Sequence, residues 1–153
     1  RTLTPRRLSP EMLARFETNG RPALAPLEWP APSSGQSLGR FEATRRVQQY
    51  ELDQMHHVNN AIYLNWIEQQ AHDAWRTWGG DPERLSLERH QIEYRQPAQS
   101  GDAVRLLSQA TRVGALLVWH HRMVRDDTIL VQARSLGAAE RVNGWGSTDR
   151  DNG

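Results

Sequence analysis

One long amphipathic segment followed by four strand-like segments limits the possible folds more than any other feature of this sequence. In residues 60–78 apolar side chains recur at helical spacing and form one broad stripe, and two glycines follow as a stop signal. Four strand-like segments come next, separated by Gly and Asp turns, at about 86–96, 103–113, 115–125 and 128–139. A meander of antiparallel strands has one apolar face, which a single helix can cover. The sequence therefore predicts an α+β domain with one helix packed on an antiparallel sheet.

The segment before the helix is expected to be a further strand, over residues 41–52, because apolar and charged side chains mix there in a strand-like pattern. Asn59 or Asn60 supplies the N-cap of the helix. Only one member of the pair His120-His121 can face the core, since successive side chains of a strand point to opposite faces.

The first 39 residues differ in composition from the rest, because six of the eight prolines lie within the first 32 residues. We expect residues 1–39 to form an arm or linker with a short helix that begins at Ser9 and ends at Gly20. A folded domain is expected over residues 40–142, followed by a flexible tail over residues 143–153.

Composition excludes several classes of function. The chain contains neither cysteine nor lysine, which removes disulfides, thiolate nucleophiles and lysine Schiff bases. A net charge of +1 with scattered charges argues against a nucleic-acid partner. The longest strongly apolar run, residues 115–119, is too short to span a membrane, and no signal segment opens the chain. A cytoplasmic protein without a metal or other cofactor is therefore expected.

The densest group of reactive side chains lies directly before the helix, in the segment 53–60 with the sequence DQMHHVNN. Free amides of a first helical turn can stabilise an oxyanion. A nearby aspartate can attack a carbonyl or take a proton from water, and a histidine can orient water or protonate a leaving group. The same residues also fit a structural role, in which Asp53 and Asn59 are caps and the histidines face solvent.

This segment resembles a known family. Residues 53–68, with the sequence DQMHHVNNAIYLNWIE, resemble the signature of hotdog-fold acyl thioesterases, most closely the acyl-carrier-protein thioesterases with their HVNN-x-x-Y-x-x-W stretch. The segment IEYRQPAQSGD, residues 92–102, is similar to the second strand and turn of that family, and the Pro-rich arm resembles the linker between its two tandem hotdog domains. The resemblance implies a hotdog fold, in which an antiparallel sheet wraps around one long central helix.

The resemblance also implies a function in fatty acid and lipid metabolism, namely hydrolysis of a fatty acyl thioester of acyl carrier protein or CoA to the free acid. Asp53 would be the nucleophile or general base, His57 would position water or the carbonyl, and Asn59 would shape the helix start. The carbonyl would meet amides of residues 58–60, and the acyl chain would lie between helix and sheet. Further substrate contacts are expected from Val58, Asn60, Tyr63 and Glu68.

Two residues depart from the family pattern: Met55 stands where the plant-type enzymes have Asn, and Pro97 stands where they have Glu. These departures leave two alternatives open. One is a non-catalytic hotdog module for binding or dimerisation, and the other is a hydratase or dehydratase acting on acyl thioesters.

A single sheet of this kind leaves an edge strand unpaired, and soluble proteins normally cover such edges. In hotdog enzymes the acyl site also lies where two hotdog domains meet. We therefore expect a two-fold homodimer, a tetramer built from two dimers, or an upstream second hotdog domain.

Overall fold

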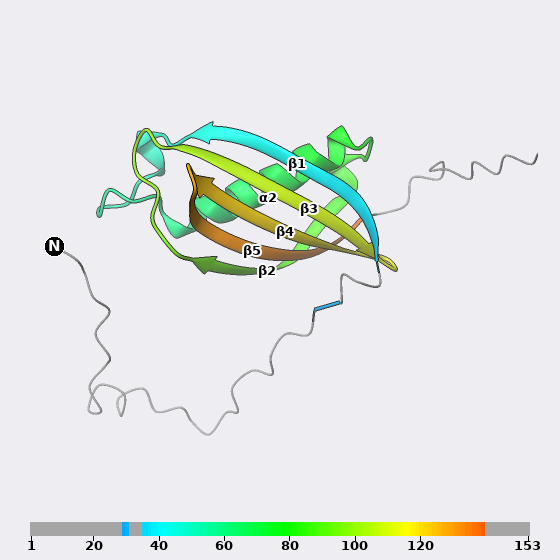
Figure 1. Cartoon of the computed structure of the whole chain (residues 1–153). Coiled ribbons are helices and arrows are strands. Elements are labelled where there is room, and N and C mark those ends of the chain that lie inside the picture. Colours follow the sequence, from blue (N-terminus) through cyan, green and yellow to red (C-terminus); the bar gives the residue numbers. More distant parts are fainter. Residues whose placement is uncertain (1–28, 31–34, 140–153) are drawn as a thin grey trace, which may run out of the picture.

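The computed structural model describes residues 29–30 and 35–139, and the elements of this part follow the predicted order (Figure 1). They are β1 (Gln36–Arg46), the 3₁₀ turn η2 (Gln49–Glu51), the helix α2 (Asn60–Thr77), the 3₁₀ turn η3 (Pro82–Arg84), β2 (Leu85–Tyr94), β3 (Ala103–Val113), β4 (Leu116–Arg125) and β5 (Thr128–Ala139). The prediction of one long helix followed by four strands is confirmed.

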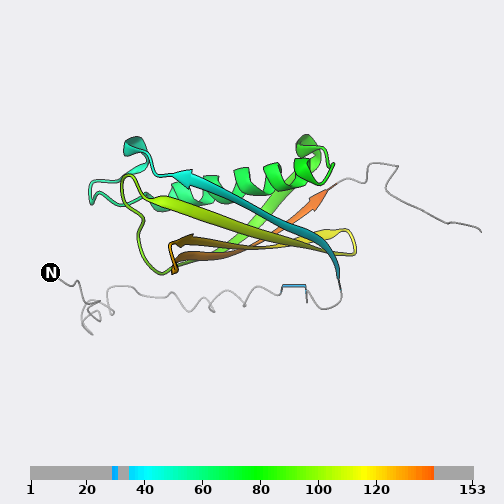
Figure 2. The same ribbon diagram turned by 45° about the horizontal axis from the view of Figure 1, so that its top comes forward.

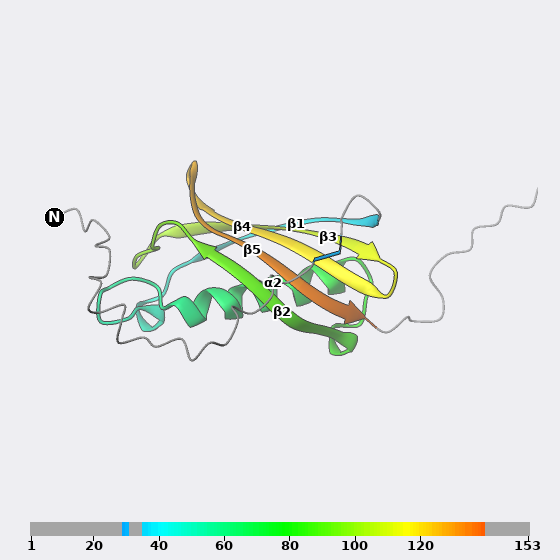
Figure 3. The same ribbon diagram turned by 90° about the horizontal axis from the view of Figure 1, so that it is seen from below.

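The strands form one antiparallel sheet in the order β1-β3-β4-β5-β2. Helix α2 crosses one face of this sheet, and the sheet curves around it (Figures 2 and 3). Strand β2 follows the helix in sequence but pairs with β5, so that β1 and β2 form the two edges. This is the expected α+β hotdog arrangement of a sheet wrapped around a central helix.

The core lies between α2 and the sheet. In the register of β3 and β4, Ala110 lies opposite Trp119, and both side chains are fully buried. On the helix, Ile67, Ala71 and Ala74 are also fully buried. Small alanines let the helix backbone approach the sheet, while Trp119 and neighbouring large side chains fill the remaining space.

Both ends of α2 have caps of the expected kind. The Asn59 side chain accepts a hydrogen bond from the Ala61 N–H at 2.9 Å, which satisfies one of the free amides of the first turn. At the other end, Trp78 is the C-cap, and Gly79 follows it with a φ of 84°, a conformation that favours glycine.

The first strand differs from the expectation. It was expected over residues 41–52, but β1 covers Gln36–Arg46 and the chain then turns at η2. The Glu51 carboxylate accepts a hydrogen bond from the Gln48 N–H at 2.8 Å, which closes a turn that ends the strand.

The short helix expected at residues 9–20 and the tail 143–153 lie outside the described residues, and the expected domain limits stay predictions. No helix in the described part of the chain is long and apolar enough to cross a membrane.

Candidate active site

The chain between η2 and α2 forms a narrow loop closed by its own backbone. The Asp53 N–H donates to the His57 carbonyl at 2.8 Å, and the His56 N–H donates to the Asp53 carbonyl at 3.0 Å. His56 has a φ of 60°, which is uncommon for a residue other than glycine. The loop therefore presents Asp53 and His57 next to each other, directly before the helix.

The Asp53 carboxylate is fixed at one oxygen and open at the other. Its Oδ1 accepts hydrogen bonds from the N–H of Met55 at 2.8 Å and of His57 at 3.2 Å. Its Oδ2 has no hydrogen-bond partner among the described residues, and the side chain is exposed. A carboxylate held in this way can take a proton from water or attack a carbonyl carbon.

His57 lies half-buried beside Asp53. Its backbone forms a bridge with Gln99 in the loop between β2 and β3, which fixes its position. Its imidazole makes no hydrogen bond within the described part of the chain, so both ring nitrogens are available to a ligand. Met55, which stands where the plant-type enzymes have Asn, is 61% exposed at the tip of the loop. Its apolar side chain therefore lies on the surface of the site.

The amides at the helix start are less available than expected. The Val58 N–H donates to the Ala98 carbonyl at 2.9 Å, and the Asn59 N–H donates to the Glu51 carbonyl at 3.0 Å. The Asn60 N–H has no hydrogen-bond partner among the residues that the structure describes. Amides of residues 58–60 were expected to bind the thioester carbonyl. Among these three, only the Asn60 N–H is without a hydrogen bond to the described residues.

Two side chains expected to contact substrate, those of Val58 and Tyr63, are buried in the core. Val58 is 3% exposed and packs in the apolar cluster under the helix. Tyr63 is 2% exposed, and its hydroxyl accepts a hydrogen bond from the Ala98 N–H at 2.8 Å. Burial raises the pKa of Tyr63, so the hydroxyl stays protonated. Val58 through its N–H and Tyr63 through its hydroxyl thus both hydrogen-bond Ala98, which connects the loop between β2 and β3 to the helix start.

A buried carboxylate that the sequence analysis missed supports the loop. Glu51 is 3% exposed, and its Oε1 accepts hydrogen bonds from Arg45 Nη2 and Trp66 Nε1, each at 3.0 Å. The Arg45 guanidinium also lies 4.4 Å from the centroid of the Trp66 ring. Glu51 therefore joins the end of β1, the turn η2 and the helix, two residues before Asp53 in the chain.

Tyr94, at the end of edge strand β2, is a second residue that the sequence analysis did not place in the site. Its hydroxyl donates to the Asn60 carbonyl at 3.1 Å, and the residue is 44% exposed. The end of β2 therefore lies against the first turn of α2, beside the Asn60 N–H.

Glu68 lies away from this group. It follows Asn60 by eight residues, which is a rise of about 12 Å along the helix. Its side chain is 46% exposed, and its Oε1 lies 3.4 Å from His90 Nε2 on β2. The structure thus brings together Asp53, His57, Asn59 and Asn60, but not Glu68. Among the described residues, no group of three His, Asp or Glu is arranged to hold a metal ion.

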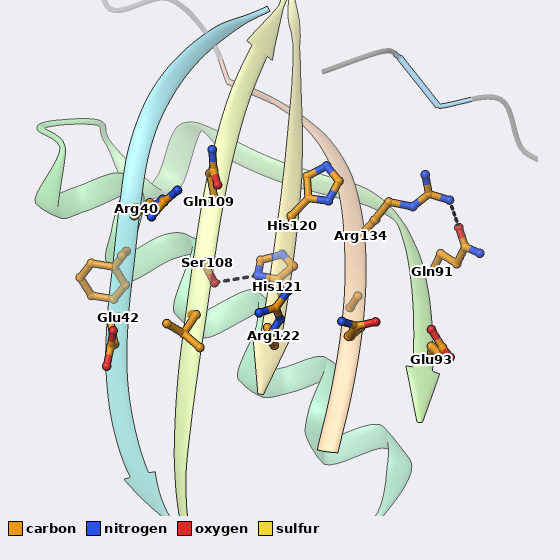
Figure 4. A pocket seen from close by; sticks show the side chains of 14 residues that line it. Arg40, Glu42, Gln91, Glu93, Ser108, Gln109, His120, His121, Arg122 and Arg134 are labelled. Carbon is orange, nitrogen blue, oxygen red and sulfur yellow. Dashed lines mark hydrogen bonds between the residues drawn. The ribbon is translucent and has the colours of Figure 1, made fainter. Parts of the chain in front are cut away.

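The structure also has a cavity of about 730 Å³, which lies on the face of the sheet opposite α2 (Figure 4). Polar side chains from all five strands line it, including Arg40, Gln109, His120 and Arg134. None of its lining residues comes from the loop that carries Asp53, so this cavity is separate from the candidate site.

The sequence matches the family described as acyl-ACP thioesterase C-terminal domain over residues 38–136. A comparison with curated proteins finds no significant match.

Solved structures with a similar fold include several thioesterases. The probable thioesterase from Bartonella henselae superposes with a TM-score of 0.62 at 19% identity, over 69% of this chain and 95% of that one. A Thermus thermophilus thioesterase complexed with coenzyme A and Zn gives a TM-score of 0.59 at 19% identity, over 66% and 79%. The 12:0-ACP thioesterase from Umbellularia californica gives 0.58 at 16% identity, over 65% of this chain and only 42% of that one.

Proposed function

The chain belongs to the acyl-ACP thioesterase C-terminal domain family, and we propose that it hydrolyses fatty acyl thioesters through Asp53, His57 and the amide of Asn60. The observation that supports these roles is the Asp53 carboxylate, which is fixed through Oδ1 by two backbone amides and open at Oδ2. It lies in the same short loop as the His57 imidazole, which makes no hydrogen bond to the described residues.

In the proposed reaction the thioester carbonyl oxygen accepts a hydrogen bond from the Asn60 N–H, where the positive end of the helix also stabilises the developing oxyanion. In one route Asp53 takes a proton from water, whose oxygen attacks the carbonyl carbon; in the other Asp53 attacks that carbon itself, and after the thiol has left, water hydrolyses the acyl-aspartate anhydride. The C–S bond breaks, the thiol leaves with a proton from His57 or solvent, and the free acid is released. Asn59 acts through its cap, which fixes the first turn of the helix.

Replacing His57 with Ala should lower turnover at least about tenfold, because a positioned imidazole is lost. The free energy of unfolding should change little, since the ring makes no hydrogen bond within the described part of the chain. Steady-state kinetics together with thermal unfolding measure both effects. A His57→Ala protein that fails to fold would assign His57 a structural role instead.

Met55 and Pro97 favour a second candidate, a hotdog module that binds acyl thioesters without hydrolysing them. A turnover assay with purified protein and long-chain acyl thioesters separates the two functions. Release of free thiol in step with free acid supports the hydrolase. Tight binding without release would support the binding module.

We propose acyl carrier protein as the preferred carrier, because the family match is to acyl-ACP thioesterases. Parallel assays with carrier-protein and CoA thioesters of one acyl chain test this preference. The role in fatty acid metabolism and the cytoplasmic location also stay predictions.

We propose further that the protein assembles as a two-fold homodimer through an edge of its sheet, or as a tetramer of two such dimers. Strand β2 is an edge in the described sheet, and Tyr94 is 44% exposed at its end, beside the proposed site. Pairing two such edges would cover unpaired backbone groups and enclose the thioester. An upstream second hotdog domain in a longer protein would serve the same purpose.

Light scattering at micromolar concentration should therefore give at least twice the mass of 17.5 kDa. A monomer of 17.5 kDa that still hydrolyses acyl thioesters would rule out a shared site.

A further inference from the structure

A row of polar side chains crosses the layer between the sheet and α2. Ser108 Oγ on β3 lies 2.8 Å from His121 Nδ1 on β4, and His121 Nε2 lies 3.2 Å from Ser135 Oγ on β5. Ser135 Oγ lies 2.9 Å from His90 Nδ1 on β2, and His90 Nε2 lies 3.4 Å from Glu68 Oε1. The row thus runs from the inside of the sheet to a carboxylate that is half in solvent; Figure 4 shows its inner end.

Packing alone does not explain this row. Ser108, His121 and Ser135 are 3%, 6% and 0% exposed, and Trp119 stacks on the His121 ring. Replacing both partners of a buried hydrogen bond by apolar side chains of the same shape can be neutral or even stabilising, so the fold does not require these polar groups. A buried polar network of this length instead suggests a role for the group at its end.

The chemistry of the five groups gives the row a direction. An ionised Glu68 carboxylate can only accept, so His90 donates from Nε2 and accepts at Nδ1 from the Ser135 hydroxyl. Ser135 then accepts from His121 Nε2–H, and His121 Nδ1 accepts from the Ser108 hydroxyl. Every hydrogen bond in the row is thus donated in the direction of Glu68. Each hydroxyl and each imidazole donates its single proton once.

This arrangement requires two neutral imidazoles. Burial, assisted by His90 and His120, lowers the pKa of His121 to about 3, and burial lowers the pKa of His90 against the opposing effect of Glu68. Both rings are therefore uncharged at neutral pH. The single charge of the row is on Glu68.

Glu68 lies on the seam between α2 and the edge strand β2. On the same face of β2, Ile92 and Tyr94 follow His90 at two-residue steps, and Tyr94 reaches Asn60 at the helix start. The seam therefore leads from the proposed thioester position to Glu68, over about 12 Å. Thioesters of carrier protein and of CoA share a pantetheine arm, whose second amide lies on the order of 10 Å from the sulfur when the arm is extended. A fixed carboxylate at that distance is an acceptor for an amide N–H.

We propose that Glu68 binds an amide N–H of the pantetheine arm, and that His90, Ser135, His121 and Ser108 are positioning residues that hold its carboxylate in place. This inference rests on the proposed site at Asn60 and adds the part of the substrate that lies along β2.

Two substitutions at His90 test the row. The side-chain amide of His90→Gln can replace Nε2 as the donor to Glu68. The shorter side chain of His90→Asn can replace only Nδ1, the atom that faces Ser135. For a pantetheine thioester, KM should rise about tenfold in Glu68→Ala and in His90→Asn, and by much less in His90→Gln, with kcat little changed. For a thioester of a simple alkyl thiol without amides, all variants should match the wild type. Gln69→Ala, an exposed neighbour on the same helix, is the matched control.

Equal effects on both substrates, or equal effects of His90→Gln and His90→Asn, would overturn the proposal. Imidazole ¹⁵N NMR of the wild-type protein tests the direction of the row without any substitution that could alter the structure. Protons on Nε2 of both His90 and His121 are expected, and a proton on His121 Nδ1 would contradict the direction of the row.

Binding of a pantetheine thioether, which cannot be hydrolysed, separates this inference from the proposed catalytic roles. Calorimetry should show weaker binding to Glu68→Ala than to the wild type, whatever the outcome at Asp53. Unchanged binding in Glu68→Ala would refute the pantetheine contact and leave the roles of Asp53 and His57 standing.

Discussion

Replacing Asp53 with Asn is expected to lower the turnover of acyl thioesters at least ~100-fold while the fold stays intact. Asn keeps an oxygen at the position of Oδ1, so the hydrogen bonds from the Met55 and His57 amides can persist. What is lost is the charged oxygen that takes a proton or attacks carbon, and removing such a group costs about two orders of magnitude or more.

The kcat/KM for a long-chain acyl thioester, with a thermal unfolding curve for the same sample, gives the two quantities needed. Gln54→Ala is the matched control, because Gln54 is an exposed neighbour in the same loop. Turnover near the wild-type value in a folded Asp53→Asn protein would remove Asp53 from the mechanism.

The elements of the fold were predictable because local patterns decide them. The apolar stripe on residues 60–78 and the Gly-Gly stop predicted α2 to within one residue of its end. Turn residues likewise placed the strands, and strand alternation predicted that one residue of the His120-His121 pair would be buried. His121 is 6% exposed, whereas His120 is exposed on the other face.

The end of β1 was not predictable in this way. Residues 47–52 mix apolar and polar side chains as a strand does, but Glu51 closes a turn onto Gln48 and also contacts Trp66, fifteen residues later. That contact exists only after the helix has packed, so no local pattern indicates it.

The candidate site was predictable as a place, but not residue by residue. Its motif located Asp53 and His57 in one loop before the helix. The roles of Val58 and Tyr63 depend on Ala98, which lies far along the chain and accepts from one and donates to the other. The row that ends at Glu68 joins residues from four strands and the helix, so its members have no common sequence signal.

Replacing Glu51 with Ala is expected to lower the free energy of unfolding by about 3 kcal/mol, with little direct effect on the reacting groups. The substitution leaves the Trp66 Nε1–H and the Gln48 N–H without their acceptor, and leaves the Arg45 guanidinium without its carboxylate. Leaving the buried Trp66 Nε1–H without its acceptor costs about 1–3 kcal/mol, and the ion pair adds a smaller amount because the Arg45 side chain is 34% exposed.

Urea unfolding followed by tryptophan fluorescence measures this loss, with Glu88→Ala on the exposed side of β2 as the matched control. Glu51→Gln keeps a side-chain carbonyl that can accept from Trp66, but its amide nitrogen cannot accept from the Gln48 N–H and the side chain carries no charge for Arg45. A loss well below the Ala value would therefore assign the larger share of the stabilisation to the hydrogen bond from Trp66. If Glu51→Ala costs less than about 1 kcal/mol, the loop that carries Asp53 does not depend on Glu51, and its own backbone bonds must suffice to hold it.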